Sequence, residues 1–252
     1  YRLAIGSVVL IFSCLICRKK FPNTLSTWID FLIYAVIGNI IPFQLIAQGQ
    51  LFITSGMAGL LMAFVPLMTI VLAHIFLPNN ELNRFKIIGF ILGISGVLFI
   101  LGPSINDGNN ELYGILLILG ATFFYSINSV IVEKFSKYDP LVAAACSTTL
   151  ASLLAFLLWP DIINLSLDGV PIKTLLNMLA LGLLSTGLGA LIYFNLINNA
   201  GAAFLSNMNY VIPVYAFTLG AFVLGEPVLW QNMVALVLIV FGIFVSRKKL
   251  KS

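Results

Sequence analysis

The chain is dominated by nine apolar stretches separated by short polar breaks. A helix needs about 20 apolar residues to cross the hydrocarbon core of a bilayer. The breaks hold the turn residues and nearly all the charge. Since a chain in lipid must satisfy its backbone polar groups internally, each stretch is predicted to be a membrane-spanning helix. The stretches cover residues 1–17, 29–47, 54–77, 85–102, 112–132, 141–159, 172–194, 201–224 and 230–246.

Composition leads to the same class. Hydrophobic residues make up 60% of the chain and charged residues 9%, whereas a soluble domain carries about a quarter charged residues. The net charge of +4 indicates no nucleic-acid partner, because the basic residues lie in the breaks. Cys14, Cys17 and Cys146 lie in apolar stretches and are expected to be reduced packing residues. The chain is therefore predicted to be an all-α polytopic membrane protein.

The basic residues are distributed unevenly between alternate breaks. If the C-terminal tail lies in the cytoplasm, eleven Lys and Arg residues fall on that side and only Arg2 and Lys173 on the other. Short cytoplasmic loops carry such an excess of basic residues. This predicts a multi-pass protein of the cytoplasmic (inner) membrane with its C-terminus in the cytoplasm.

Residues 56–96 and 203–242 look like two copies of one segment. Each has small residues, an apolar helix with a central proline, a break with a glutamate, and a second apolar helix that closes on glycine. Pro66 corresponds to Pro213 at an offset of 147 residues. The copies lie five spans apart, an odd number, and so cross the membrane in opposite directions. This predicts an inverted repeat of five transmembrane helices.

The repeat divides the chain into residues 1–110 and residues 111–252. The second part holds five predicted spans and the first part only four. We therefore expect a ten-helix fold of which nine helices are present in this chain and the first helix is missing. Inverted repeats in membrane proteins favour transport, because two related halves can rock against each other around a central site.

Three segments resemble the EamA-type bacterial branch of the drug/metabolite transporter superfamily. They are residues 41–74, with a Pro-Phe start and a central proline, residues 119–135, and residues 181–228, with Gly225-Glu226 near their end. The resemblance covers essentially the whole chain. It implies two EamA repeats, ten helices, cytoplasmic termini and a central cavity lined by the first four helices of each half.

Polar residues inside the fifth span are candidates for a transport pathway, because polar groups in lipid are costly. Thr122, Tyr125, Ser126 and Ser129 share one helix face, and Asn128 lies beside it. This face is either a cavity wall or a contact that holds helices together. We expect Tyr125 to line a cavity.

Amides in the second and seventh spans form a second candidate. Gln44 and Gln48 lie one turn apart, and Gln48 corresponds to Asn195 under the same offset. A matched pair of amides suits a site between the repeats, although amides at helix ends are equally compatible with the pattern.

The central prolines complete the predicted site. Asn207 and Tyr210 share a face of the eighth span just before Pro213. Pro66 and Pro213 each remove a helical hydrogen bond, which favours either flexing points beside a cavity or static packing kinks. The predicted substrate-binding residues are Gln44, Gln48, Phe64, Pro66, Tyr125, Asn128, Asn195, Asn207, Tyr210 and Pro213.

Ionisable residues near the span ends are assigned simpler roles. His74 is expected at the membrane interface, and Glu226 is expected to cap the helix that follows it. In the first repeat the corresponding break, residues 78–81, lacks the Gly-Glu pair. Arg2 is a candidate for binding an anionic group.

The motifs do not indicate an enzyme. The chain has one histidine and no HExxH, GxSxG or P-loop pattern, so no catalytic residue, cofactor or metal is expected. The spacings Gly89-x-x-x-Gly93 and Ser185-x-x-x-Gly189 favour tight helix packing or a homodimer contact.

These features predict a secondary transporter that moves small organic metabolites by alternating access. A neutral cavity rich in amides and aromatic rings suits amino-acid-like or related amphipathic solutes, and the family analogy favours export. The expected partners are a small-molecule substrate and the lipid bilayer, with no nucleic acid. A passive membrane channel or a non-transporting receptor or scaffold is the alternative.

Overall fold

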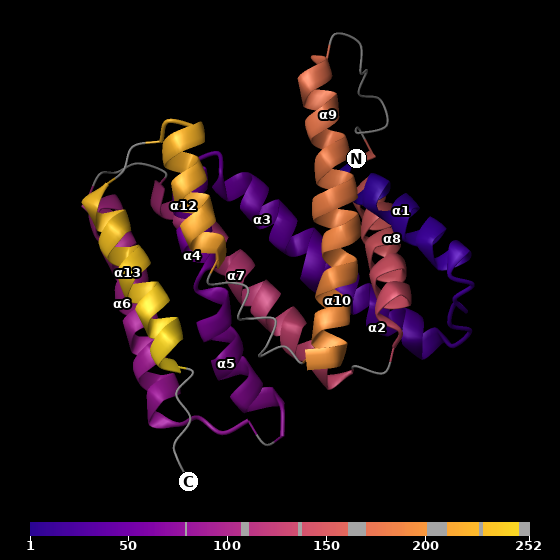
Figure 1. Cartoon of the computed structure of the whole chain (residues 1–252), viewed down its shortest axis with the longest axis horizontal. Helices are drawn as coiled ribbons and strands as arrows, with labels where there is room; N and C mark the ends of the chain where they lie inside the picture. The colour runs from indigo at the N-terminus through magenta and orange to yellow at the C-terminus, as the bar shows by residue number, and fades with distance from the viewer. Residues whose placement is uncertain are drawn as a thin grey trace. The chain divides into compact units, whose positions relative to one another are not determined.

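The computed structural model describes residues 1–78, 80–106, 111–135, 138–160, 170–200, 211–226 and 229–246, with the backbone alone at 103–106 and 211–213. Across these residues the regular structure is helical throughout (Figure 1). The helices are α1 (Arg2–Ile16), α2 (Leu25–Ala35), the π-helix η1 (Val36–Ile40), α3 (Ile41–Gly49), α4 (Ser55–Met62), α5 (Val65–Phe76), α6 (Arg84–Asn106), α7 (Glu111–Lys134), α8 (Pro140–Leu158), α9 (Ile172–Ala180), the π-helix η3 (Leu181–Leu188), α10 (Gly189–Ala200), α12 (Val211–Val223) and α13 (Trp230–Ser246).

The helices fall on the predicted apolar stretches. Within the described residues, six helical segments are long and apolar enough to cross a bilayer, and three shorter apolar helices accompany them. The six are Leu25–Gly49, Ser55–Phe76, Arg84–Gly102, Glu111–Lys134, Pro140–Leu158 and Ile172–Ala200, and the shorter ones are Arg2–Ile16, Val214–Val223 and Trp230–Ser246. The prediction of an all-α polytopic membrane protein is therefore confirmed.

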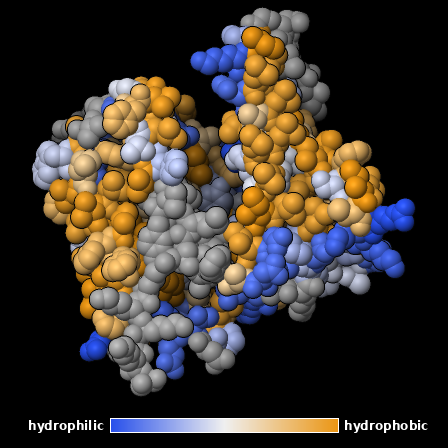
Figure 2. Space-filling model, viewed as in Figure 1, coloured by the Kyte–Doolittle hydropathy of each residue, from blue (hydrophilic) through white to orange (hydrophobic). Residues whose placement is uncertain are grey.

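The surface has the character expected of a protein in lipid. Phe222 is 89% exposed and Leu157 is 76% exposed. Figure 2 shows hydrophobic residues covering most of the helix surface that faces the viewer. Large apolar side chains on the outside carry no hydration cost in hydrocarbon, because they are not in contact with water.

The chain forms two compact units. Unit 1 comprises residues 1–40 and 135–201, and unit 2 comprises residues 41–134 and 202–252. Each unit therefore contains residues from both predicted repeats. The helix α2–η1–α3 belongs to unit 1 as far as the end of η1 and to unit 2 from the start of α3.

Small residues let α6 and α13 pack closely in unit 2. A Cβ atom placed on Gly89 would lie 2.3 Å from the carbonyl oxygen of Gly242, and one on Gly96 would lie 2.7 Å from Cγ1 of Ile239. The glycine spacing in α6 thus serves packing within the chain. Around this contact lies the apolar core of unit 2, which includes Leu60, Leu61, Phe64, Leu67, Ile115, Ile118, Ile239 and Ile243.

In unit 1, glycine residues likewise let α1 and η3 pack closely. A Cβ atom on Gly6 would lie 2.7 Å from Cγ2 of Thr186, and one on Gly182 would lie 2.6 Å from Cβ of Ile5. Elsewhere in this unit the aromatic rings of Phe31, Tyr34 and Phe194 pack in sequence, with centroids 6.1 and 5.9 Å apart. The free thiols of Cys14 and Cys146 are buried as expected, whereas Cys17 is exposed.

Candidate functional site

The polar face of α7 is mostly occupied by packing. Thr122, Ser126 and Ser129 are buried. Thr122 Oγ1 donates to the carbonyl of Leu119 at 2.7 Å, and Ser129 Oγ donates to that of Tyr125 at 2.9 Å. These two hydroxyl groups donate to carbonyls three and four residues back on their own helix, the usual within-helix pairing of Ser and Thr.

Ser126 ties α7 to the start of α5. Its Oγ donates to the carbonyl of Val65 at 3.0 Å, and Thr69 Oγ1 donates to the same oxygen at 2.8 Å. Pro66 follows Val65 and lies in the first turn of α5. Proline is tolerated in a first turn, because its missing N–H has no helical partner there. The central proline of this span therefore marks a break between α4 and α5.

Tyr125 and the glutamine pair lie on two helices of unit 2 that pack together, α7 and α3. The half-buried ring of Tyr125 meets Phe43 edge to face, with centroids 6.5 Å apart. Gln44 and Gln48 are half-buried one turn apart on α3. Asn128, one turn along α7 from Tyr125, is only 4% exposed. These four predicted residues therefore lie on one pair of packed helices.

Phe64 lies inside the core of unit 2. Its side chain is 5% exposed and stacks on Phe90 of α6 at 5.6 Å. A Cβ atom on Gly93 would lie 3.1 Å from its ring. In this conformation Phe64 is part of the helix packing.

The predicted residues after position 190 are Asn195, Asn207, Tyr210 and Pro213. Asn195 belongs to unit 1, is exposed on α10, and accepts a hydrogen bond from Asn199 Nδ2. Its proposed counterpart Gln48 belongs to unit 2. Asn207 and Tyr210 lie outside the described residues, and of Pro213 in α12 only the backbone is described. Their participation in a site stays a prediction.

The π-helices are a feature that the sequence did not suggest. Shifting η1 by the repeat offset of 147 residues gives 183–187, which falls inside η3 (Leu181–Leu188). The two predicted repeats thus each carry a π-helical segment at positions that correspond under this offset. Such segments are frequent at functional sites. The signal in the sequence was a pair of small or polar residues within an apolar span, Gly38-Asn39 and Ser185-Thr186.

Arg2 is held by η3. Its Nε donates to Thr186 Oγ1 at 2.7 Å, and its Nη2 donates to Ser185 Oγ at 3.1 Å. Ser185 also lines a surface groove of about 480 Å³ together with Asn177 and Leu181. A charged guanidinium group in lipid is costly and therefore often has a function. Arg2 stays a candidate for binding an anion.

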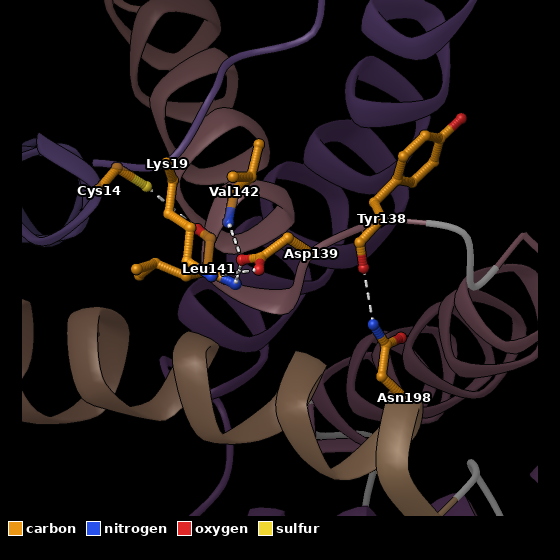
Figure 3. Close-up of polar contacts among 7 residues, drawn as sticks. All are labelled: Cys14, Lys19, Tyr138, Asp139, Leu141, Val142 and Asn198. Carbon is orange, nitrogen blue, oxygen red and sulfur yellow. Dashed lines mark hydrogen bonds and ion pairs between the residues drawn. The ribbon is translucent and has the colours of Figure 1, made fainter. Parts of the chain in front are cut away.

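A polar cluster joins the ends of several helices in unit 1 (Figure 3). Asp139 Oδ1 accepts from the N–H groups of Leu141 and Val142 at 3.0 and 3.3 Å and so caps α8. Lys19 Nζ lies 2.7 Å from Asp139 Oδ2. Asn198 Nδ2 at the end of α10 donates to the carbonyl of Tyr138 at 2.7 Å. The cluster fastens α1, α8 and α10 to one another.

The cluster changes the proton affinity of its charged groups. Partial burial by itself raises the pKa of Asp139, but the hydrogen bonds from Lys19 and from two backbone N–H groups outweigh it. The pKa of the Asp139 carboxyl therefore lies below its ordinary value. The same hydrogen bond raises the pKa of Lys19. Both pKa shifts are in the direction that favours the charged forms, the carboxylate and the ammonium group, which make the ion pair.

Two ionisable residues lie at other span ends. His74 is exposed, and its Nδ1 lies 2.6 Å from the carbonyl oxygen of Asn80. Glu226 does cap a helix, but this helix is α4 and not the helix that follows it. Its two carboxylate oxygens accept from the N–H groups of Ser55 and Gly56, each at 2.8 Å. Sequence reasoning missed this contact because the partners are 171 and 170 residues away.

Comparison with known proteins yields one family and several relatives. The model of the EamA-like transporter family matches residues 1–102 and 112–247. The chain is similar to YoaV of Bacillus subtilis, which is named an uncharacterized transporter, with 26% identity over 97% of this chain and 84% of the relative. It is also similar to an uncharacterized transporter of Archaeoglobus fulgidus, with 27% identity over 80% of this chain and 71% of the relative.

Two further similarities bear on function and fold. A probable amino-acid metabolite efflux pump of Salmonella typhimurium is 25% identical over 76% of this chain and 67% of its own length. A crystal structure of another protein superimposes with a TM-score of 0.70 at 20% identity, covering 98% of this chain and 85% of that one. At this identity the superposition supports the fold alone.

Proposed function

Because this chain belongs to the EamA-like transporter family, we propose that it is a secondary transporter that exports small organic metabolites. The observation that carries the proposal is the family match over both parts of a chain built from membrane-length apolar helices. Amino-acid-like solutes are the proposed substrate class. The name of the Salmonella typhimurium relative, which specifies amino-acid metabolites and efflux, supports both the class and the direction.

The proposed mechanism is alternating access between two inverted repeats. The neutral donors and acceptors of Gln44, Gln48, Tyr125 and Asn128 lie on α3 and α7 in unit 2. Amides and a phenol hydroxyl bind the polar groups of a zwitterionic solute without a net charge to neutralise. The π-helical segments η1 and η3 break the regular hydrogen bonding of their spans at equivalent places, and they are the proposed flexing points.

The membrane, topology and assembly belong to the same proposal. The protein crosses the membrane several times. We propose that this membrane is the cytoplasmic one and that the C-terminus faces the cytoplasm, as the basic residues predict. A C-terminal fusion that is active only in the cytoplasm tests the orientation. The predicted homodimer is tested by chemical cross-linking of the protein in its membrane.

Flux measurements test the function. Purified protein in lipid vesicles that hold an unlabelled internal pool is expected to accumulate labelled amino-acid-like solutes above their external concentration by exchange. A passive channel only equalises the two concentrations of the labelled solute. Solutes for the assay come from comparing metabolites inside and outside cells that express or lack the full-length protein. If no solute redistributes and the vesicles show no flux, the protein is not a transporter.

A pair of tyrosine variants on one helix tests the site. Tyr125→Phe is expected to lower transport efficiency about tenfold, because one substrate hydrogen bond is lost. Tyr113→Phe serves as the control, since Tyr113 is 53% exposed near the start of the same helix. Equal transport by the two variants would remove Tyr125 from the site.

A further inference from the structure

The turn after α12 directs a carboxylate back toward another helix of unit 2. Gly225 has a φ of +67°, a left-handed conformation that glycine adopts without strain. This lets the N–H of Glu226 donate to the carbonyl of Gly220 at 3.0 Å, which folds the turn over the end of α12. The side chain of Glu226 then reaches the first residues of α4.

The carboxylate meets the N-terminus of α4 with both oxygens. Oε1 accepts from the N–H of Ser55 and Oε2 accepts from the N–H of Gly56, each at 2.8 Å. Thr54 Oγ1 accepts from the N–H of Met57 at 3.2 Å. A helix N-terminus carries partial positive charge, and hydrogen bonds to an ionised acceptor are stronger than neutral ones. One residue of the second predicted repeat therefore satisfies donors of the first.

Glycine residues, which have no side chain, make room for this contact. A Cβ atom on Gly220 would lie 2.5 Å from Oε2 of Glu226, and one on Gly56 would lie 2.8 Å from the same oxygen. Farther along the two helices, a Cβ atom on Gly59 would lie 2.1 Å from Cβ of Ala216. Because the backbones of α4 and α12 approach this closely, their contact leaves no path between them at this end.

We propose that Glu226 is a gating residue whose carboxylate holds the start of α4 against the end of α12 while that side of the transporter is closed. The proposal rests on the proposed transport function. In the predicted orientation both helix ends lie on the extracytoplasmic side, so that opening to that side requires them to separate. Water replaces the two hydrogen bonds when they separate, because both the carboxylate and the N–H groups then become solvated.

Thiol labelling measures whether the contact opens. In a variant with Cys14, Cys17 and Cys146 replaced by alanine, Phe217→Cys is the reporter, because Phe217 lies beside Gly56 in the contact and its replacement by cysteine adds no bulk. A membrane-impermeant maleimide is added from outside. Glu226→Gln is expected to speed labelling about tenfold, the change that corresponds to losing one charge-assisted hydrogen bond. Glu81→Gln, in the corresponding break of the first repeat, is expected to leave the rate unchanged.

A second variant separates gating from folding. Gly220→Ala keeps the charge of Glu226 but places a methyl group where the carboxylate lies, so that faster labelling is again expected. Unchanged labelling in both variants overturns the proposal. If neither variant accumulates as monodisperse protein, Glu226 is a folding determinant and the proposal is overturned as well.

The flux of the parent protein distinguishes this proposal from the one on which it rests. If the parent protein moves solute but Glu226→Gln and the parent are labelled at equal rates, Glu226 has no gating role and the transport function is unaffected. Parent protein that moves no solute removes transport, and with it the gating role, even if Glu226→Gln accelerates labelling.

Discussion

Asp139 caps the helix that it precedes, whereas Glu226 caps a helix 170 residues away in the sequence. Both carboxylates accept two backbone hydrogen bonds at a helix N-terminus. The cap of Asp139 is formed by its own chain neighbours and survives any movement of other helices. The cap of Glu226 exists only while α12 lies against α4. The same chemistry therefore stabilises one helix permanently and one contact conditionally.

The largest expected effect is that of reversing the remote charge. Glu226→Lys places an ammonium group at the positive end of α4 and removes two charge-assisted hydrogen bonds. We expect it to lower the free energy of unfolding by about 2–3 kcal/mol. The thermal midpoint in detergent should fall several degrees below that of the parent. A midpoint equal to that of the parent would show that Glu226 contributes nothing to this contact.

The local cap is expected to matter less. Asp139→Ala removes both hydrogen bonds to the first turn of α8 and should cost about 1 kcal/mol. Asp139→Asn keeps an N-cap acceptor and should recover most of that loss, which a comparison of thermal midpoints measures. The two capping bonds are local and the ion pair with Lys19 joins helices of unit 1 alone, so neither variant should change the labelling of Phe217→Cys in unit 2. If Asp139→Ala accelerated this labelling, the distinction between local and remote caps would fail.

Acid should weaken the local cap by a smaller amount. The pKa of Asp139 is lower in the folded protein than its ordinary value, so the stabilisation is present above the unfolded pKa of about 4. It is lost as the pH falls through the folded pKa. Since the Asp139 side chain is 36% exposed, the effect should stay below about 1 kcal/mol. Thermal midpoints of the parent and Asp139→Asn should converge as the pH falls from 6 to 3, and parallel curves would contradict the expectation.

The smallest effect is expected at the other cap of α4. Thr54→Ala removes one hydrogen bond of 3.2 Å to Met57 but leaves both bonds to Glu226. The cost should be about 0.5 kcal/mol, read from the thermal midpoint. The double variant Thr54→Ala with Glu226→Gln should lose more than the sum of the single variants, since α4 then keeps at most one side-chain acceptor, the amide oxygen at position 226. Simple additivity would mean that the two caps act independently.

The spans were predictable because their signal is local. Each apolar stretch was recognised from its own residues, and helices lie on all of them within the described residues. The polar stripe of α7 was also recognised, but its role was not. Ser126 and a cavity-lining serine have the same sequence pattern, and only the carbonyl of Val65 on a different helix shows that Ser126 joins two helices.

The site was predictable only in part for a related reason. Gln44, Gln48, Tyr125 and Asn128 were selected as polar residues inside spans, and they lie on two packed helices. Phe64 was also selected, but its ring is buried against Phe90. Whether an aromatic ring lines a pathway or fills a core depends on its neighbours in space.

The sequence by itself determined that this chain crosses the membrane as helices. Its apolar stretches are long enough to span a bilayer, and in hydrocarbon a helix satisfies the backbone hydrogen bonds within each stretch. It also determined the cap of α8, whose donors are the next residues along the chain. Only the tertiary structure decided that Glu226 meets Ser55 and that Arg2 meets Thr186. Such pairs depend on how helices pack, and packing is set by side chains that are distant in the sequence.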